Sequence, residues 1–150
     1  MANDTMVKFG YPDSLIRDYE HWVVLLRPAQ VTLGSLILAA KSDATAFGQL
    51  APGAHAELAA VTKDIEATLL AEIGYEKINY LMLMMVDPHV HFHVFPRYDG
   101  CRALGGAELD DAGWPGPPDL KSARKLDEIE RKNACEMLVS QWRSSQTNSG

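Results

Sequence analysis

The stretch His89-Val90-His91-Phe92-His93-Val94-Phe95 holds three of the five histidines of the chain at alternate positions. On a β-strand, side chains at positions i, i+2 and i+4 point to the same face. We therefore predict a strand with three imidazoles on one face and apolar residues packed on the other. Ser, Thr or Lys would serve a merely solvent-facing stripe equally well, so the pattern favours a functional site.

Further strands are predicted on both sides of this stretch. Apolar, partly β-branched runs predict strands at 22–26, 33–38 and 77–86. Since only Asp87-Pro88 separates the run 77–86 from the histidine strand, we expect the two to form an antiparallel hairpin.

The remaining segments predict helices and loops. Pro52 suits a first helical turn and Gly74 a helix stop, so the main helix is expected over 52–72. Charges of alternating sign predict a C-terminal helix from Asp119 to Arg143. We also expect a helical turn up to Arg17, a short helix over 44–50, and a long loop over 98–118 because that segment is rich in Gly and Pro.

The composition limits the class of protein. The chain has 150 residues, a net charge of −6 and 47% hydrophobic residues, which suits one globular domain. We predict that domain over 13–143, with an N-terminal extension over 1–12 and a disordered tail over 144–150. The longest apolar run, 80–86, is far shorter than the roughly 18 residues of a membrane helix. We expect a cytoplasmic protein that binds neither membranes nor polymeric nucleic acid, because broad nucleic-acid binding relies on many cations.

Two chemistries could use three imidazoles on one face. Neutral imidazole is a common zinc ligand, but strand geometry places His89 and His93 roughly 13 Å apart at the backbone, against zinc–nitrogen bonds of about 2 Å. Neutral imidazole is also a competent nucleophile near neutral pH when a neighbour holds its other ring nitrogen as a donor. Neighbouring imidazoles or strand carbonyls could provide that orientation, and both readings stay open on geometry alone.

The same stretch resembles the signature of the histidine triad family, in which three histidines alternate with apolar residues. The resemblance extends over about Leu15 to Tyr98 in the layout of strands, connector and helix. It implies an α+β fold, in which one main helix packs on an antiparallel sheet and a C-terminal helix follows. It also implies a homodimer that binds nucleotides. Carried over by position, it makes His91 the nucleophile, places His93 at the phosphate and leaving group, and gives His89 an orienting role.

Phe95-Pro96-Arg97 after the triad is more similar to the branch of the fragile histidine triad protein and the dinucleoside polyphosphate hydrolases. Other positions depart from the family pattern, because Arg27 and Ser35 stand where many members have an Asp or Asn and a histidine. Residues 82–86 also carry no side-chain hydrogen-bond donor. We therefore expect the substrate pocket to use Arg27, Ser35, Asn79 and Arg97, with help from the 98–118 loop.

The resemblance implies a nucleotide hydrolase or nucleotidyl transferase. It would cleave dinucleoside polyphosphates or related adenylylated compounds at the α-phosphorus through a nucleotidyl-histidine intermediate. No cofactor and no resident metal are expected, although a divalent cation could enter with the polyphosphate. Two alternatives remain: a nucleotide-binding or sensing module with residual catalysis, and a zinc protein that uses the histidine strand.

Overall fold

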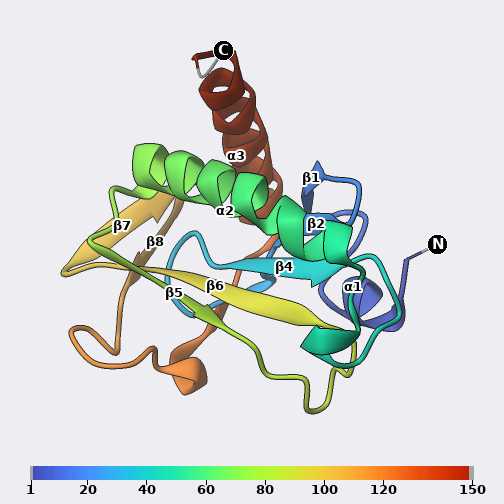
Figure 1. Cartoon of the computed structure of the whole chain (residues 1–150). Coiled ribbons are helices and arrows are strands. Elements are labelled where there is room, and N and C mark those ends of the chain that lie inside the picture. The colour runs from blue at the N-terminus through green and yellow to red at the C-terminus, as the bar shows by residue number, and fades with distance from the viewer. Residues whose placement is uncertain (1, 149–150) are drawn as a thin grey trace.

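A computed structural model of the chain describes residues 2–148. It is an α+β protein with a five-stranded antiparallel sheet, a long helix across one face and a second long helix at the C-terminus (Figure 1). The helices are α1 Asp4–Lys8, α2 Pro52–Ile73 and α3 Glu128–Asn148, with 3-10 turns at Phe47–Gln49 and Leu120–Ser122. The strands are β1 Leu15–Asp18, β2 Trp22–Leu26, β3 Ala29–Gln30, β4 Leu36–Ala40, β5 Lys77–Leu81, β6 His91–Arg97, β7 Cys101–Leu104, β8 Ala107–Asp110 and β9 Arg124–Lys125.

The main sheet has the strand order β1-β2-β4-β6-β5, with every neighbouring pair antiparallel. Strand β6, which carries His91 and His93, therefore lies between two partners inside the sheet. Its register pairs His91 with Ala39 and His93 with Ile37. Paired residues in an antiparallel sheet share a face, so both imidazoles lie on the face of those two β4 side chains.

Helix α2 covers the opposite face. Val61, Ile65 and Leu69 are fully buried and pack against sheet residues that include Trp22 and Val94. The helix begins at Pro52 and ends at Gly74, whose left-handed φ of 64° and N–H bond to the Leu70 carbonyl form a regular C-cap. The predicted main helix is thus confirmed, one residue longer than expected. None of the helices within residues 2–148 is long and apolar enough to cross a membrane.

The N-terminal segment covers the histidine face. Helix α1 and the residues after it place Met6 and Phe9 in a buried cluster with β2 and β4 side chains. The members from the sheet are Val23, Leu25, Ile37 and Ala39. The segment predicted as an extension is therefore packed on the sheet, on the face away from α2.

Two strand predictions were wrong around the histidines. The run 77–86 forms a strand only as far as Leu81, and β6 starts at His91, so residues 82–90 form a loop in place of a tight Asp87-Pro88 turn. Groups of this loop bind outside the strand ladder: Asp87 pairs with Lys8 at 2.8 Å, and the Val90 N–H donates to the Ala44 carbonyl.

The segment predicted as a long loop contains a β-hairpin. Strands β7 and β8 pair across Gly105-Gly106, with φ values of 61° and 89°. Only glycine takes such angles readily, and Gly-Gly is a recognised hairpin turn. Helix α3 begins at Glu128, nine residues after Asp119, because Asp127 and Glu130 cap it reciprocally.

Three smaller predictions also differ. Residues 15–18 form strand β1 instead of a helical turn. The strand predicted over 33–38 is β4, which spans Leu36–Ala40. The short helix predicted over 44–50 is only a 3-10 turn over Phe47–Gln49. Helix α3 continues to Asn148, into the predicted tail, while 149 and 150 lie outside the described residues.

Candidate active site

His91 is held in one tautomer by the backbone. Its Nδ1 lies 2.7 Å from the carbonyl oxygen of His89. A carbonyl oxygen only accepts, so in the neutral ring Nδ1 carries the proton and donates it, and Nε2 keeps the lone pair. That Nε2 is buried and has no hydrogen-bond partner. An imidazole with one nitrogen anchored and the other bare is arranged as a nucleophile.

His93 stands next to His91 on the same face of β6. The two ring centroids are 5.0 Å apart, with the planes inclined by 70°. The Nε of Arg27, just after β2, donates to His93 Nδ1 at 3.3 Å. Burial chiefly, together with the nearby charges of Arg27 and His91, lowers the pKa of His93 to about 4. His93 is therefore neutral in the protein at physiological pH.

His89 does not continue this row. It precedes β6, and its Nδ1 lies 2.9 Å from the hydroxyl of Thr5 in α1. The prediction of three imidazoles on one regular strand was therefore wrong for the first of them. The His89 carbonyl binds the His91 ring, while the His89 ring binds the N-terminal segment through Thr5.

The N-terminal segment lies over the histidine pair. The ring of Phe9 packs against both imidazoles, with centroid separations of 5.6 Å to His91 and 5.7 Å to His93. Phe9 is 9% exposed and Thr5 only 1%. The sequence did not reveal either residue, because residues 1–12 carry no periodic pattern that links them to the triad.

Of the predicted substrate residues, Arg27 alone is hydrogen-bonded to a histidine of the triad in the structure. Ser35 is fully buried, and its hydroxyl donates to the Thr32 carbonyl at 2.6 Å within its own loop. The expectation that Ser35 reaches a phosphate is not supported by this placement, since its hydroxyl stabilises the loop between β3 and β4.

Arg97 is also occupied elsewhere. Its guanidinium binds both carboxylate oxygens of Asp111, at 2.7 and 3.1 Å, and donates to Asn79 Oδ1 and to the Gly116 carbonyl, each at 2.8 Å. The pair is almost completely buried, so its charge is neutralised inside the protein. Arg97 therefore anchors the 98–118 segment to the sheet and is not free to bind a phosphate.

Asn79 lines a pocket of about 340 Å³ together with Lys77, Arg97 and residues 114–117. Asn79 pairs with Phe95 in the sheet, two positions along β6 from His93. The pocket is thus a neighbour of the histidine site on the same face, with the Phe95 position between them.

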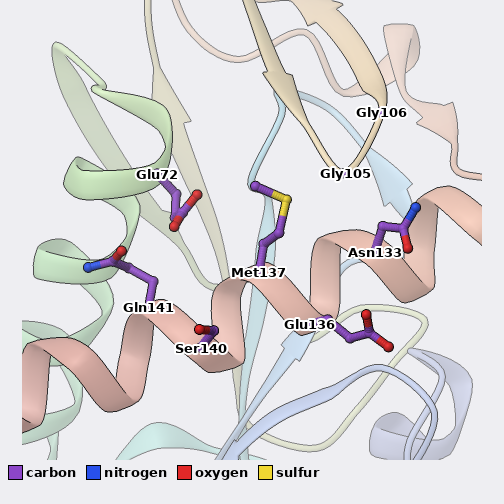
Figure 2. Close-up of a pocket in the computed structure, with 8 residues that line it drawn as sticks. All are labelled: Glu72, Gly105, Gly106, Asn133, Glu136, Met137, Ser140 and Gln141. Atoms are coloured by element: carbon purple, nitrogen blue, oxygen red, sulfur yellow. The ribbon is translucent and has the colours of Figure 1, made fainter.

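A larger pocket of about 520 Å³ lies on the far side, between α2, the β7–β8 turn and α3 (Figure 2). Glu72 and Glu136 contribute two carboxylates and no cation lines it, so its charge is unsuited to a phosphate ligand. It contains none of the histidines. Size alone therefore does not identify the candidate site.

No metal-binding cluster of three His, Cys, Asp or Glu side chains occurs among the described residues. At the triad, the lone pair of His93 Nδ1 faces the Arg27 cation, and His91 Nδ1 faces a carbonyl oxygen. The two imidazoles are thus engaged in hydrogen bonds at one nitrogen each.

No protein-family profile matches the sequence, and a search of curated proteins found no match. Solved structures do resemble the chain. A histidine triad protein of Sinorhizobium meliloti 1021 has a TM-score of 0.73 at 23% identity, over 94% of this chain and 96% of that one. A hypothetical histidine triad nucleotide-binding protein of Sulfolobus tokodaii strain 7 has a TM-score of 0.70 at 14% identity, over 95% and 91%. A Zn-bound histidine triad family protein of Mycobacterium smegmatis has a TM-score of 0.64 at 19% identity, over 95% and 93%. The chain therefore has the fold of the histidine triad proteins.

Proposed function

We propose that the chain is a nucleotide hydrolase or nucleotidyl transferase that acts through a covalent intermediate on His91. The observation that carries the proposal is the state of its ring: Nδ1 is held by the His89 carbonyl, and Nε2 is bare. His93, a second neutral imidazole, stands 5.0 Å away between ring centroids. The fold that the chain shares with histidine triad proteins also supports nucleotide hydrolysis or nucleotidyl transfer.

The proposed reaction has two steps. His91 Nε2 attacks the α-phosphorus, forming an N–P bond, while the P–O bond to the leaving group breaks and its electron pair leaves with that group. The imidazole becomes cationic, and its Nδ1–H bond to the His89 carbonyl stabilises that charge. Water, or another acceptor in a transferase, then attacks phosphorus and releases the nucleotide together with neutral His91.

We further propose dinucleoside polyphosphates or related adenylylated compounds as substrates. The Arg27 cation beside His93 supports an anionic substrate, because a guanidinium suits phosphate oxygens. One structural neighbour carries a nucleotide-binding name. No cofactor is needed for this chemistry, and a divalent cation would enter with the polyphosphate. The active unit is proposed to be a homodimer.

The test is to find the intermediate. The full chain is incubated with diadenosine triphosphate, diadenosine tetraphosphate and adenosine phosphoramidate, quenched, digested and analysed by mass spectrometry. We expect an adenylyl adduct on the peptide that contains His91. The variant His91→Asn should lose the adduct and several orders of magnitude in kcat. A wild type that turns over without an adduct, or a His91→Asn variant with full activity, would refute the proposed intermediate.

A nucleotide-binding or sensing module is the second candidate, favoured by the burial of His91 Nε2 under the N-terminal segment. Tight AMP binding with negligible turnover across the substrate panel would support it. The third candidate, a zinc protein, predicts stoichiometric zinc in tag-free protein that is lost on replacing His89 or His91.

A further inference from the structure

The Arg27 side chain is fixed against the triad by several contacts. Its Nε donates to His93 Nδ1 at 3.3 Å, and its Nη1 donates to the carbonyl of Ala29. The guanidinium also stands over the Phe95 ring, 5.8 Å from the centroid. Its backbone is anchored too, since its N–H donates to the Ser35 carbonyl at 3.0 Å. The cation thus has a defined place on the histidine face.

This contact determines which nitrogen of His93 carries the proton. A guanidinium offers only donors and keeps its charge in proteins, so the Nδ1 it binds must present a lone pair. A neutral imidazole has one N–H, which must then be on Nε2. A second proton could bind only at Nδ1, the atom that faces the cation.

The other groups around His93 also disfavour its protonation, except for one carboxylate. His91 is beside it on β6, and Phe9 covers it from the N-terminal segment, leaving it 8% exposed. The carboxylate of Asp87 in the 82–90 loop opposes Arg27 electrostatically, but it is paired with Lys8 at 2.8 Å.

We propose that Arg27 is a positioning residue that holds His93 as a neutral imidazole with its proton on Nε2. The inference rests on the proposed function and deepens it. His93 then donates a hydrogen bond to a phosphate oxygen and keeps its proton throughout. When the P–O bond breaks, the leaving group departs with the electron pair and receives no proton from His93, because a neutral imidazole N–H is a very weak acid.

This role restricts the leaving group. A phosphate or polyphosphate leaves as a stable anion and needs no proton, whereas an amine leaves only after protonation. The structure therefore favours phosphoanhydride substrates over phosphoramidates, and the preference is assigned to Arg27.

The first test needs no substrate. Two-bond proton–nitrogen NMR correlations of the full, labelled chain report which imidazole nitrogen carries a proton. We expect the Nε2–H form of His93 near neutral pH, persisting to about pH 5. Arg27→Met should populate both tautomers and raise the titration midpoint of His93 by about one unit or more. Arg102→Met is the matched control, because Arg102 stands 4.8 Å over the Tyr98 ring and touches no imidazole of the triad.

Two NMR outcomes would overturn the proposal: an Nδ1–H tautomer in the wild type, or an unchanged tautomer and midpoint in Arg27→Met. Since neither depends on turnover, failure to find a His91 adduct would refute the proposed function and leave this result standing. Kinetics provide a second readout. Wild type should prefer diadenosine triphosphate to adenosine phosphoramidate in kcat/KM by roughly 100-fold, and Arg27→Met should narrow that ratio. Equal rates in the wild type would contradict the restriction on the leaving group.

Discussion

At the residue scale, the site is defined by which atom each histidine presents. The His89 carbonyl accepts from Nδ1 of His91 and leaves its Nε2 without a partner, Arg27 donates to Nδ1 of His93, and Thr5 binds the ring of His89. Three chemically identical side chains thus have three different hydrogen-bonding states. The division arises from their partners, because imidazole itself adopts either tautomer at little cost.

The state of His93 has a consequence for stability. Its pKa falls from the ordinary 6.5 to about 4 in the folded chain, chiefly through burial. Between pH 6.5 and about pH 4, His93 is therefore neutral in the folded chain and protonated in the unfolded chain. Unfolding free energy should be unaffected by His93 above about pH 6.5 and should decrease as pH falls toward 4, by about 2 kcal/mol between roughly pH 8 and pH 5.

Urea denaturation at several pH values measures this loss. Other groups also titrate in the same range, so the His93→Gln variant provides the reference curve. The wild type should lose more stability than the variant on acidification, by the stated amount. Parallel curves would show that His93 binds its proton equally well in the folded and unfolded chain.

At the scale of elements, the N-terminal segment closes the site. Phe9 packs on His91 and His93, Thr5 binds His89, and Lys8 pairs with Asp87 in the loop before β6. His91 Nε2 has no solvent-accessible surface in this arrangement. The proposed reaction brings a tetrahedral phosphorus within about 3.5 Å of His91 Nε2, so we predict that this cover moves before substrate binds.

Chemical modification tests this requirement. Diethyl pyrocarbonate acylates accessible neutral imidazoles, so the exposed His55 should react quickly and His91 slowly. Phe9→Ala removes the covering ring and should raise the rate at His91 by roughly tenfold, because local opening then costs less. Val7→Ala, at a position 56% exposed in α1 just before Phe9, should leave the rate unchanged.

The two cysteines distinguish local opening from global unfolding. Cys101 is exposed and should react with a thiol reagent in every variant, whereas Cys135 in α3 is buried and belongs to the main hydrophobic cluster. Cys135 should stay protected in Phe9→Ala while His91 becomes reactive. A joint rise at both residues, or no rise at His91, would contradict a movable cover.

The same elements show what the sequence could and could not reveal. Helix α2 and strands β2 and β6 were predictable, because each carries its own periodicity and end signals. The β7–β8 hairpin and the start of α3 also had local signals, the Gly105-Gly106 turn and the Asp127–Glu130 capping pair, which were outweighed by the Gly, Pro and charge content around them.

The candidate site divides in the same way. The placement of His91 and His93 on one face was predictable from their alternation with apolar residues, since strand geometry is local. The partners were not: Thr5 reaches His89 across 84 positions, and Arg27 reaches His93 across 66. Arg97 looked available for phosphate because its buried partner, Asp111, lies 14 positions further along the chain. Such contacts depend on tertiary packing, which one sequence does not display.

At the scale of the whole molecule, the two edge strands of the main sheet differ, because helix α3 contacts β1 whereas β5 lies at the other edge. Helix α2 covers one face and the N-terminal segment the other, while β5 pairs only with β6 in the described sheet. The loop that follows β5 exposes Leu83, Met85 and Val86 at 41%, 83% and 84%. An unpaired antiparallel edge beside apolar side chains is self-complementary under a two-fold axis, which suits a second copy of this chain.

The proposed homodimer can be measured by sedimentation velocity, with twice the chain mass expected at micromolar concentration. The double variant Met85→Lys and Val86→Lys places charge beside the β5 edge and should shift the protein to monomer, since like charges would meet across the two-fold axis. Ile129→Lys is the matched control, because Ile129 is 73% exposed at the start of α3 and should leave the mass unchanged. A monomeric wild type would exclude the dimer. A dimer that survives the double variant would place its interface away from β5.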